Sequence, residues 1–216
     1  METGLPMTRI TQITKKKFIL HPLGGIFWKE KSLLLISDVH LGKVAHFRKF
    51  GAAVPQKAVH KNYLLLDEIV THFNPFQLIF LGDLFHSSLN KEWALFENWV
   101  AKTPAEIILI AGNHDIIAPH KFEELGIPIF PELVLDQFLL THHPEKRKGL
   151  FNFCGHIHPA VRLQGFGRQK LKLPCFFKSD GQLILPAFGE FTGTHILQPQ
   201  EKDEVFVIVE NEVVKV

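Results

Sequence analysis

The sequence has little cysteine, little net charge and no long hydrophobic run. Two cysteines in 216 residues, Cys154 and Cys175, are too few for a disulfide framework, so we expect reduced thiols and a cytoplasmic location. The apolar runs, such as 33–36 and 107–111, fall far short of the roughly 20 residues that span a bilayer. The short apolar run after Lys15–Lys17 does not fit a signal peptide, and no membrane partner is expected. The 24 Lys and Arg nearly balance the 22 Asp and Glu, so bulk charge does not indicate nucleic acid binding.

Histidine, in contrast, is abundant, with 13 residues in the chain. Histidine ligates transition metals and carries protons near neutral pH. The 13 are scattered without a tract, which excludes an affinity tag. A metal site or an excess without function remain as explanations, and the positions of the histidines must decide between them.

The hydrophobic pattern predicts alternating strands and helices in the first half of the chain and mostly strands in the second. Short continuous apolar runs predict buried strands at 32–37, 77–81 and 107–111, and helical spacing predicts helices at 55–73 and 91–101. Further strands are predicted at 17–21, 26–28, 133–141, 150–154, 160–163, 171–177, 183–185 and 205–209. We therefore expect an α/β protein with two sheets and helices outside, forming one domain over 1–216. Residues 1–14 are expected to be a loose arm or an edge strand.

Five of the apolar strands run directly into residues that ligate metals. These residues are Asp38 and His40, Asp83, Asn113 to Asp115, His142, and His156 and His158. Ligands of layered α/β proteins bind beyond the carboxyl ends of strands, so these side chains are expected at one edge. Imidazole, carboxylate and amide ligands in this number suit two ions such as Mn, Fe, Zn or Co. Glycines 82, 112 and 155 precede the ligands, where the chain must turn tightly.

The motifs at these strand ends resemble, in order, the five motifs of the calcineurin-like metallophosphoesterases. They are Asp38-Val39-His40, Gly82-Asp83, Gly112-Asn113-His114-Asp115, His142 and Gly155-His156-Ile157-His158. The resemblance implies a four-layer α/β/β/α sandwich with two mixed β-sheets. It also implies a phosphoesterase that uses two divalent metal ions, for which Mn is expected and Fe, Zn or Co are alternatives.

The same resemblance implies roles for individual residues. Asp38, His40 and His158 would hold the first metal, Asp83 would bridge, and Asn113, His142 and His156 would hold the second. A hydroxide between the metals would attack phosphorus, and His114, held by Asp115, would protonate the leaving group. His143 competes with His142 as a ligand; His142 is preferred because it directly follows the strand.

The connecting segments resemble the ligase-associated DNA damage response endonuclease (PdeM) subfamily over about 33–193. The segments that carry this likeness include His40-Leu41-Gly42-Lys43, His46-Phe47-Arg48-Lys49, Gly82-Asp83-Leu84-Phe85-His86-Ser87 and Leu185-Pro186-Ala187-Phe188-Gly189. The subfamily implies cleavage of phosphodiesters in DNA or RNA, a role in DNA repair, and a functional link to a DNA ligase and a helicase. Lys43, Arg48 and His86 are the candidate substrate-binding residues.

Two further basic clusters follow the later motifs. Lys146 to Lys148 come soon after His142, and Arg162, Arg168, Lys170 and Lys172 follow the last motif. Both are candidate phosphate contacts, although a solvated loop is an equally good explanation of 146–148.

Other functions of the same ligand set remain open. A nucleotide or lipid-nucleotide pyrophosphate hydrolase shares the motifs but usually carries a lid insertion, for which the short spacing of 14 residues from His142 to His156 leaves little room. A non-catalytic scaffold of this fold would tend to lose the histidines, which this chain keeps. The arm at 1–14 and the strand-rich C-terminal part are candidate surfaces for a homodimer.

Overall fold

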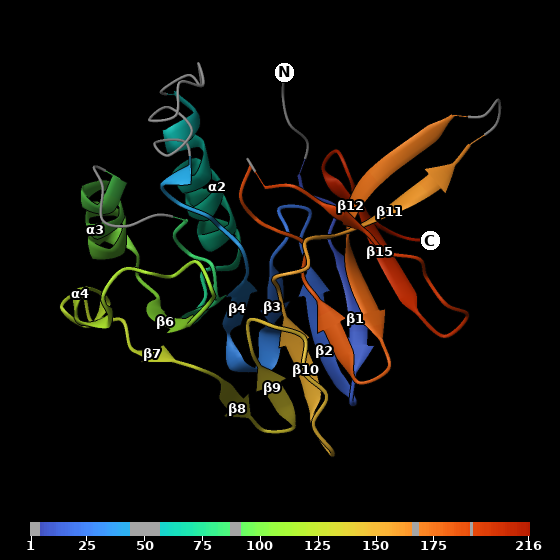
Figure 1. Cartoon of the computed structure of the whole chain (residues 1–216), viewed down its shortest axis with the longest axis horizontal. Helices are drawn as coiled ribbons and strands as arrows, with labels where there is room; N and C mark the ends of the chain where they lie inside the picture. Colours follow the sequence, from blue (N-terminus) through green and yellow to red (C-terminus); the bar gives the residue numbers. More distant parts are fainter. Residues whose placement is uncertain (1–4, 44–56, 87–91, 166–168, 191) are drawn as a thin grey trace.

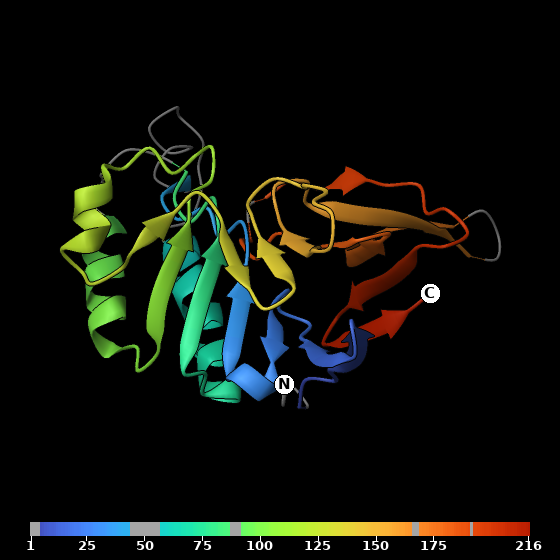
Figure 2. The ribbon, with the colours of Figure 1, turned by 90° about the horizontal axis from the view of Figure 1, so that it is seen from below.

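Two mixed β-sheets pack face to face, and helices cover the outer face of the first sheet (Figures 1 and 2). The computed structural model describes residues 5–43, 57–86, 92–165, 169–190 and 192–216. No helix in these ranges is long and apolar enough to cross a membrane. The α/β class with two mixed sheets is therefore as expected.

The first sheet has seven strands in chain order, antiparallel from β1 to β4 and parallel from β4 to β7. Its strands are β1 (Arg9–Ile13), β2 (Lys16–Leu20), β3 (Ile26–Trp28), β4 (Leu33–Ile36), β5 (Gln77–Leu81), β6 (Glu106–Ile110) and β7 (Ile129–Phe130). The helices are η1 (Lys29–Lys31), α2 (Lys57–Phe73), α3 (Glu92–Lys102) and α4 (Pro119–Glu123).

The second sheet has nine strands in the order β14-β11-β12-β13-β10-β9-β8, and β15 joins β12 to β16. Its strands are β8 (Leu133–Leu135), β9 (Phe138–Leu140), β10 (Phe151–Cys154), β11 (Pro159–Gln164), β12 (Lys170–Ser179), β13 (Gln182–Ile184), β14 (His195–Ile196), β15 (Glu204–Val209) and β16 (Glu212–Lys215). β9, β10 and β13 are parallel neighbours, so their carboxyl ends lie together.

Strand β4 is apolar throughout because both of its faces are covered. Leu34 and Ile36 pack with the helices, whereas Leu33 and Leu35 pack between the sheets. The core between the sheets is rich in aromatic rings; Phe18, for example, lies with ring centroids 5.0 to 5.3 Å from those of Trp28, Phe138 and Phe153. This packing holds the carboxyl ends of strands from both sheets in fixed positions.

The strand assignments need one correction and three additions. Residues 133–141 form the hairpin β8–β9 rather than one strand, because the chain turns at Asp136, whose φ is 54°. Part of the segment expected to be a loose arm or an edge strand is β1, paired with β2 along five residues. β7, β14 and β16 had no counterpart among the predicted strands.

The outer face of the second sheet carries no helix among the described residues. The described part of the chain therefore forms three of the four expected layers, namely one helix layer and the two sheets. The apolar side chains of this face form a third cluster, which includes Cys154, Val161, Leu173, Cys175 and Val207. Both cysteines are buried free thiols, and burial raises the pKa of Cys175 to about 12. Neither thiol is therefore poised to react.

Candidate metal centre

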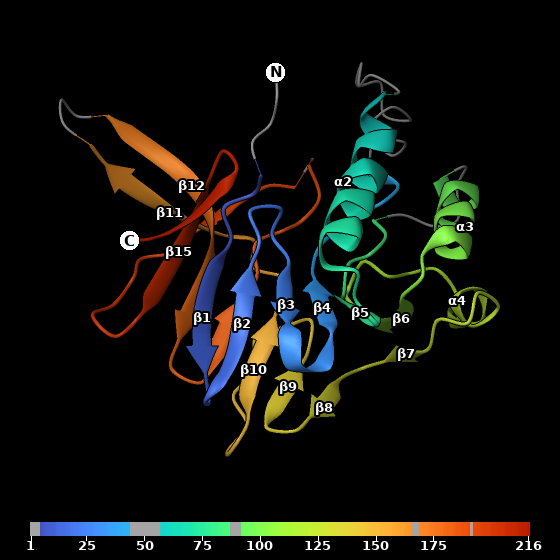
Figure 3. The same cartoon turned by 180° about the vertical axis from the view of Figure 1, so that it is seen from behind.

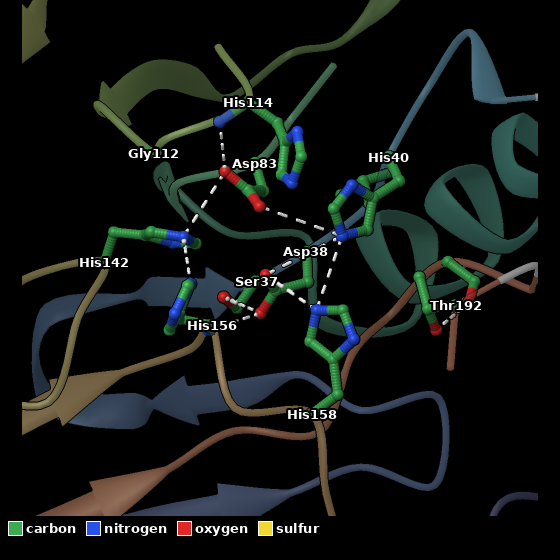
Figure 4. Close-up of polar contacts among 12 residues, drawn as sticks. Ser37, Asp38, His40, Asp83, Gly112, His114, His142, His156, His158 and Thr192 are labelled. Carbon is green, nitrogen blue, oxygen red and sulfur yellow. Dashed lines mark hydrogen bonds and ion pairs between the residues drawn. The ribbon is translucent and has the colours of Figure 1, made fainter. Parts of the chain in front are cut away.

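The structure brings the predicted ligands together at the edge where strands of both sheets end (Figure 4). The first sheet contributes the residues after β4, β5 and β6, and the second contributes those after β9 and β10. Two overlapping groups of side chains result.

The first group consists of Asp38, His40 and His158. Nε2 of His158 lies 3.1 Å from Oδ1 of Asp38 and 3.3 Å from Nε2 of His40. Nε2 of His40 lies 3.9 Å from the same Asp38 oxygen. The three ligand atoms therefore converge on one point, as the ligands of a single cation do.

The second group surrounds His142. Its Nε2 lies 3.0 Å from Oδ1 of Asn113, 3.2 Å from Nδ1 of His156 and 3.3 Å from Oδ1 of Asp83. The other oxygen of Asp83 lies 3.9 Å from Nε2 of His40, in the first group. Asp83 thus offers one carboxylate oxygen to each group, which is the position that a bridging ligand needs.

Hydrogen bonds from outside the two groups orient the ligands. Nδ1 of His142 lies 2.9 Å from the carbonyl oxygen of Leu81, and Nδ1 of His158 lies 3.0 Å from that of Gly193. An Nδ1–H that donates to a carbonyl leaves the lone pair of Nε2 free for a cation. The exposed His143 also lies close to this group, because its ring centroid is 4.0 Å from that of His156 and its ligand atom lies within 4.8 Å of those of His142 and His156. The preference for His142 over His143 as the ligand therefore stays a prediction.

Two observations indicate that these residues suit a bound cation. Oδ1 of Asp38 is buried and accepts no well-aligned hydrogen bond from the described residues. Its other oxygen is already occupied, because it accepts the His156 backbone N–H at 2.9 Å and lies 2.6 Å from the Ser37 hydroxyl. The donor set of imidazole nitrogen with carboxylate and amide oxygen suits a transition-metal ion such as Mn, Fe, Zn or Co.

The electrostatics of the first group keep its ligands in forms that bind cations. Burial raises the pKa of Asp38, but the His158 ring and the Ser37 hydroxyl lower it, and the net pKa lies below its usual range. Burial, with the neighbouring His158, lowers the pKa of His40 to about 3. Burial lowers the pKa of His158 while contact with Asp38 raises it, and the net pKa lies above its ordinary value. A cation bound here would compete with a proton for the same atoms of Asp38 and His158, so its affinity would fall in acid.

Five ligands adopt left-handed backbone conformations, which residues other than glycine rarely do. They are Asp38 (φ 57°), His40 (φ 52°), Asp83 (φ 51°), His156 (φ 66°) and His158 (φ 52°). Such conformations cluster at functional sites, where the surrounding structure holds them in place.

Two of the glycines before the ligands leave room that a side chain would fill. A Cβ at Gly112 would overlap the backbone nitrogen and Oδ1 of Asp83. A Cβ at Gly155 would overlap Oγ of Ser37 and crowd Oδ2 of Asp38. These glycines are therefore required for close approach to the carboxylates, as their place in the sequence suggested.

The contacts of Asp115 differ from those expected. Its carboxylate accepts the backbone N–H groups of Phe85 at 3.0 Å and Gly112 at 2.9 Å, and no contact with the His114 ring is seen. Asp115 thus joins the loop after β6 to the loop after β5. The His114 ring instead lies against the ring of His86, with centroids 4.5 Å apart, and 5.7 Å from that of His40. His114 is held by its own backbone N–H, which donates to Oδ1 of Asp83 at 2.9 Å.

Two of the three candidate substrate-binding residues lie near the centre. His86 lies beside His114 and His40. Lys43 is half-buried near the centre; burial lowers its pKa, and Asp83 and Asp38 only partly oppose the shift. Arg48 lies outside the described residues.

The basic loop at 146–148 is tied down by its middle residue. Arg147 makes ion pairs with Glu132 at 2.7 Å and Glu145 at 2.5 Å. This favours a structural role for Arg147 over a phosphate contact.

Three residues that support the centre were not singled out from the sequence. Ser37 contacts Asp38, the amide of Asn62 on α2 donates to the carbonyl of Val39, and the Glu92 carboxylate accepts the Gly42 N–H at 2.7 Å. Asn62 and Glu92 are buried polar residues on otherwise apolar helix faces. A polar residue at such a position in the sequence was the one indication that they have a structural partner.

The fold of the chain is similar to that of a nuclease of known structure. The Pseudomonas putida nuclease MPE superposes with a TM-score of 0.80 at 27% identity, covering 97% of this chain and all of that one. The Escherichia coli phosphoesterase Yfce gives a TM-score of 0.44 at 16% identity over 85% of this chain and 97% of that one. No curated protein matched the sequence.

A family profile matches the part of the chain that carries most of the centre. The profile of the calcineurin-like phosphoesterases covers residues 31–169, which is more than half of the chain and includes every ligand described above. The chain therefore belongs to the calcineurin-like phosphoesterase family, whose members are metal-dependent phosphoester hydrolases.

Proposed function

We propose that this protein is a binuclear-metal phosphodiesterase that cleaves the backbone of nucleic acids. The observation that carries the proposal is the pair of ligand groups that share Asp83. Asp38, His40 and His158 would hold one ion, Asn113, His142 and His156 would hold the other, and Asp83 would contribute to both.

Two divalent ions bound here would supply an ionised water at neutral pH and offset the charge on the phosphoryl oxygens. The protein's own residues orient and hold this arrangement. Leu81 and Gly193 carbonyls fix the rings of His142 and His158. Asp115 acts as a positioning residue, because it joins the loops that carry Asp83 and His114.

In this proposal His114 donates a proton to the departing oxygen. Its ring is half-buried and lies beside the first group, packed on His86, and its backbone is anchored on Asp83. A general acid at this position contributes roughly 10²–10⁴ to the rate when the leaving group is a poor one.

The choice of nucleic acid as substrate is supported by the likeness to the Pseudomonas putida nuclease MPE along the whole chain. Mn as the ion and a role in DNA repair beside a ligase and a helicase are further parts of the proposal, and they rest on the resemblance of the sequence motifs and connecting segments. A homodimer is the last part of the proposal. A pyrophosphate hydrolase is the second candidate, because the ligand set alone does not distinguish a diester from a pyrophosphate.

The test compares substrates side by side with Mn²⁺. The panel contains a mononucleotide ester, a cyclic nucleotide, bis(4-nitrophenyl) phosphate, a dinucleoside pyrophosphate, and single- and double-stranded DNA. We expect hydrolysis of the small diester and of at least one DNA. Turnover confined to the pyrophosphate would instead establish the second candidate.

The proposed role of His114 has its own variant. His114→Ala should keep both ions, measured by metal analysis, and lose roughly 10²–10⁴ of its rate on DNA but little on bis(4-nitrophenyl) phosphate, whose leaving group needs no acid. His120→Ala, at an exposed histidine on α4, is the matched control. Normal DNA cleavage by His114→Ala would show that another group donates the proton.

A further inference from the structure

The hairpin of β11 and β12 extends away from both sheets as a two-stranded arm, here defined as residues 159–165 and 169–174 (Figure 3). β11 begins at Pro159, the residue after the ligand His158. The root of the arm is therefore part of the metal centre, and its far end lies well outside it.

The register of the arm gathers its basic residues on one face. Arg162 lies opposite Lys172, and Gln164 lies opposite Lys170. Because side chains alternate along a strand, these four side chains share one face. The other face carries the apolar residues Val161, Leu163, Leu171 and Leu173.

This basic strip, made of Arg162, Lys170 and Lys172, has no acidic partner. All three side chains are exposed and none makes an ion pair with the described residues. No Asp or Glu occurs between Glu145 and Asp180 in the sequence. Arg147 and Lys178, which lie in the same stretch of sequence without acidic residues, are instead paired with glutamates.

The strip also places like charges in direct opposition. Side chains opposite each other in an antiparallel pair have Cβ atoms about 4.5–5.5 Å apart, and like charges there are destabilising. Arg162 and Lys172 stand in that relation. The described residues of the arm include no acidic side chain that would offset this repulsion, whereas a bound polyanion would offset it.

We propose that the basic strip binds the phosphate backbone of a nucleic acid strand whose scissile phosphodiester lies at the metal centre. The inference rests on the proposed function and extends it to how the substrate is held. Arg162 is four residues along an extended strand from His158, about 13 Å, and alternate residues of the strip are about 7 Å apart. The strip therefore contacts phosphates that are nucleotides away from the cleaved bond, and a small diester does not reach it.

The test uses the Mn²⁺-loaded protein and a fluorescein-labelled phosphorothioate oligodeoxynucleotide, which resists cleavage. Arg162→Gln/Lys172→Gln should weaken binding roughly tenfold and reduce the slope of log affinity against log salt by about 1.4, since each single-strand phosphate contact contributes about 0.7. Its turnover of bis(4-nitrophenyl) phosphate should equal that of the parent.

Two controls separate charge at the strip from charge elsewhere and from folding. Arg162→Lys/Lys172→Arg keeps both charges in place and should retain the parent's salt slope. Lys29→Gln/Lys102→Gln removes two exposed charges from η1 and α3 and should also retain it. Thermal melts confirm that each variant is folded.

The failures of the two proposals are distinguishable. An unchanged salt slope in the Gln variant, or no oligonucleotide binding by the parent protein, overturns the strip. A parent that binds the oligonucleotide through the strip but hydrolyses no phosphodiester overturns the proposed function and leaves the strip established.

Discussion

Five of the candidate ligands have a positive φ, and the energetic cost of this backbone conformation must be offset by other contacts in the centre. A left-handed conformation costs an L-residue roughly 1–2 kcal/mol relative to its ordinary conformations. Asp38, His40, Asp83, His156 and His158 all adopt it. Their geometry is therefore held by neighbouring contacts, such as the His156 N–H on Asp38 and the His114 N–H on Asp83.

Gly155→Ala should damage the centre although no candidate ligand is substituted. The added methyl group would overlap Oγ of Ser37 and crowd Oδ2 of Asp38, and its distance to Cβ of Ser37 would be 2.7 Å. Overpacking of this kind typically costs about 1–3 kcal/mol, and here it also displaces the Asp38 carboxylate. We expect a lower melting temperature and at least tenfold weaker Mn²⁺ binding, measured by titration calorimetry.

The control for this change is Gly165→Ala on the arm, where the nearest atom to an added Cβ is 3.9 Å away. It should leave both melting temperature and Mn²⁺ affinity at the parent's values. Equal Mn²⁺ affinity in Gly155→Ala and Gly165→Ala would contradict the argument from close packing.

At the residue scale, the ligand types were predictable and their supports were not. Asp38 and His142 directly follow buried strands, a position that sequence alone reveals. The partners of Asp115 depend on how two loops from different strands meet, and no local pattern encodes that. For the same reason the role expected for Asp115 beside His114 did not match its contacts.

At the element scale, a buried histidine joins β2 to the helix layer. The His21 ring lies 4.9 Å from that of His72 and 5.4 Å from that of Phe73, at the end of α2. Its Nδ1 accepts the Leu23 N–H at 3.2 Å, and its Nε2 is buried without a partner among the described residues. Burial, followed by the charge of His72, lowers the pKa of His21 to about 4.

The low pKa of His21 predicts that the fold weakens in mild acid. Between pH 6.5 and 4 the unfolded chain protonates this histidine while the folded protein does not, so the unfolded state binds more protons and stability falls as the pH falls. Well above pH 6.5, His21 is neutral in both states and causes no loss of stability. By pH 4 the free energy of unfolding should have fallen by roughly 3 kcal/mol, at about 1.36 kcal/mol per unit of pKa difference.

Urea unfolding of the chelator-treated protein from pH 7 to pH 4 measures this dependence, with His21→Asn as the comparison. Asparagine retains an acceptor for the Leu23 N–H and does not titrate. We expect the unfolding free energy of the parent to fall more steeply with acid than that of the variant. Parallel curves would show that another group is responsible.

Most elements were predictable because their hydrophobic periods are clear. β5 matches its predicted range at both ends, and α3 and β10 do so within a residue. The β8–β9 hairpin was not, because a turn at Asp136 without glycine or proline leaves an apolar pattern that reads as one strand. β16 is short and carries Glu212 and Lys215, so it becomes a strand through its pairing with β15.

At the scale of the whole molecule, the two sheets meet at the ligands. Asp38, His40 and Asp83 follow strands of the first sheet, whereas His142, His156 and His158 follow strands of the second. This arrangement depends on the packing of one sheet on the other, which the order of motifs along the chain does not contain. Ions bound at the centre would therefore link the sheets in the folded state only.

Metal binding should accordingly stabilise the entire fold. An ion that binds only the folded protein contributes about 2.7 kcal/mol at 100 times its dissociation constant. A chain of this size gains roughly 2–4 °C of melting temperature per kcal/mol, so each ion should raise it by about 5–10 °C. Adding Mn²⁺ to chelator-treated protein in a thermal melt measures the increase.

Asp83→Asn tests whether the increase arises at the shared carboxylate, because the change removes one charge at nearly constant shape. The Mn²⁺-dependent rise should fall by at least half in this variant, since one ion loses its oxygen ligand and both lose the shared negative charge. Asp180→Asn, in the exposed turn between β12 and β13, is the matched control and should keep the parent's rise. If Asp83→Asn gains as much from Mn²⁺ as the parent does, the stabilising ions bind elsewhere and Asp83 does not bridge the two ligand groups.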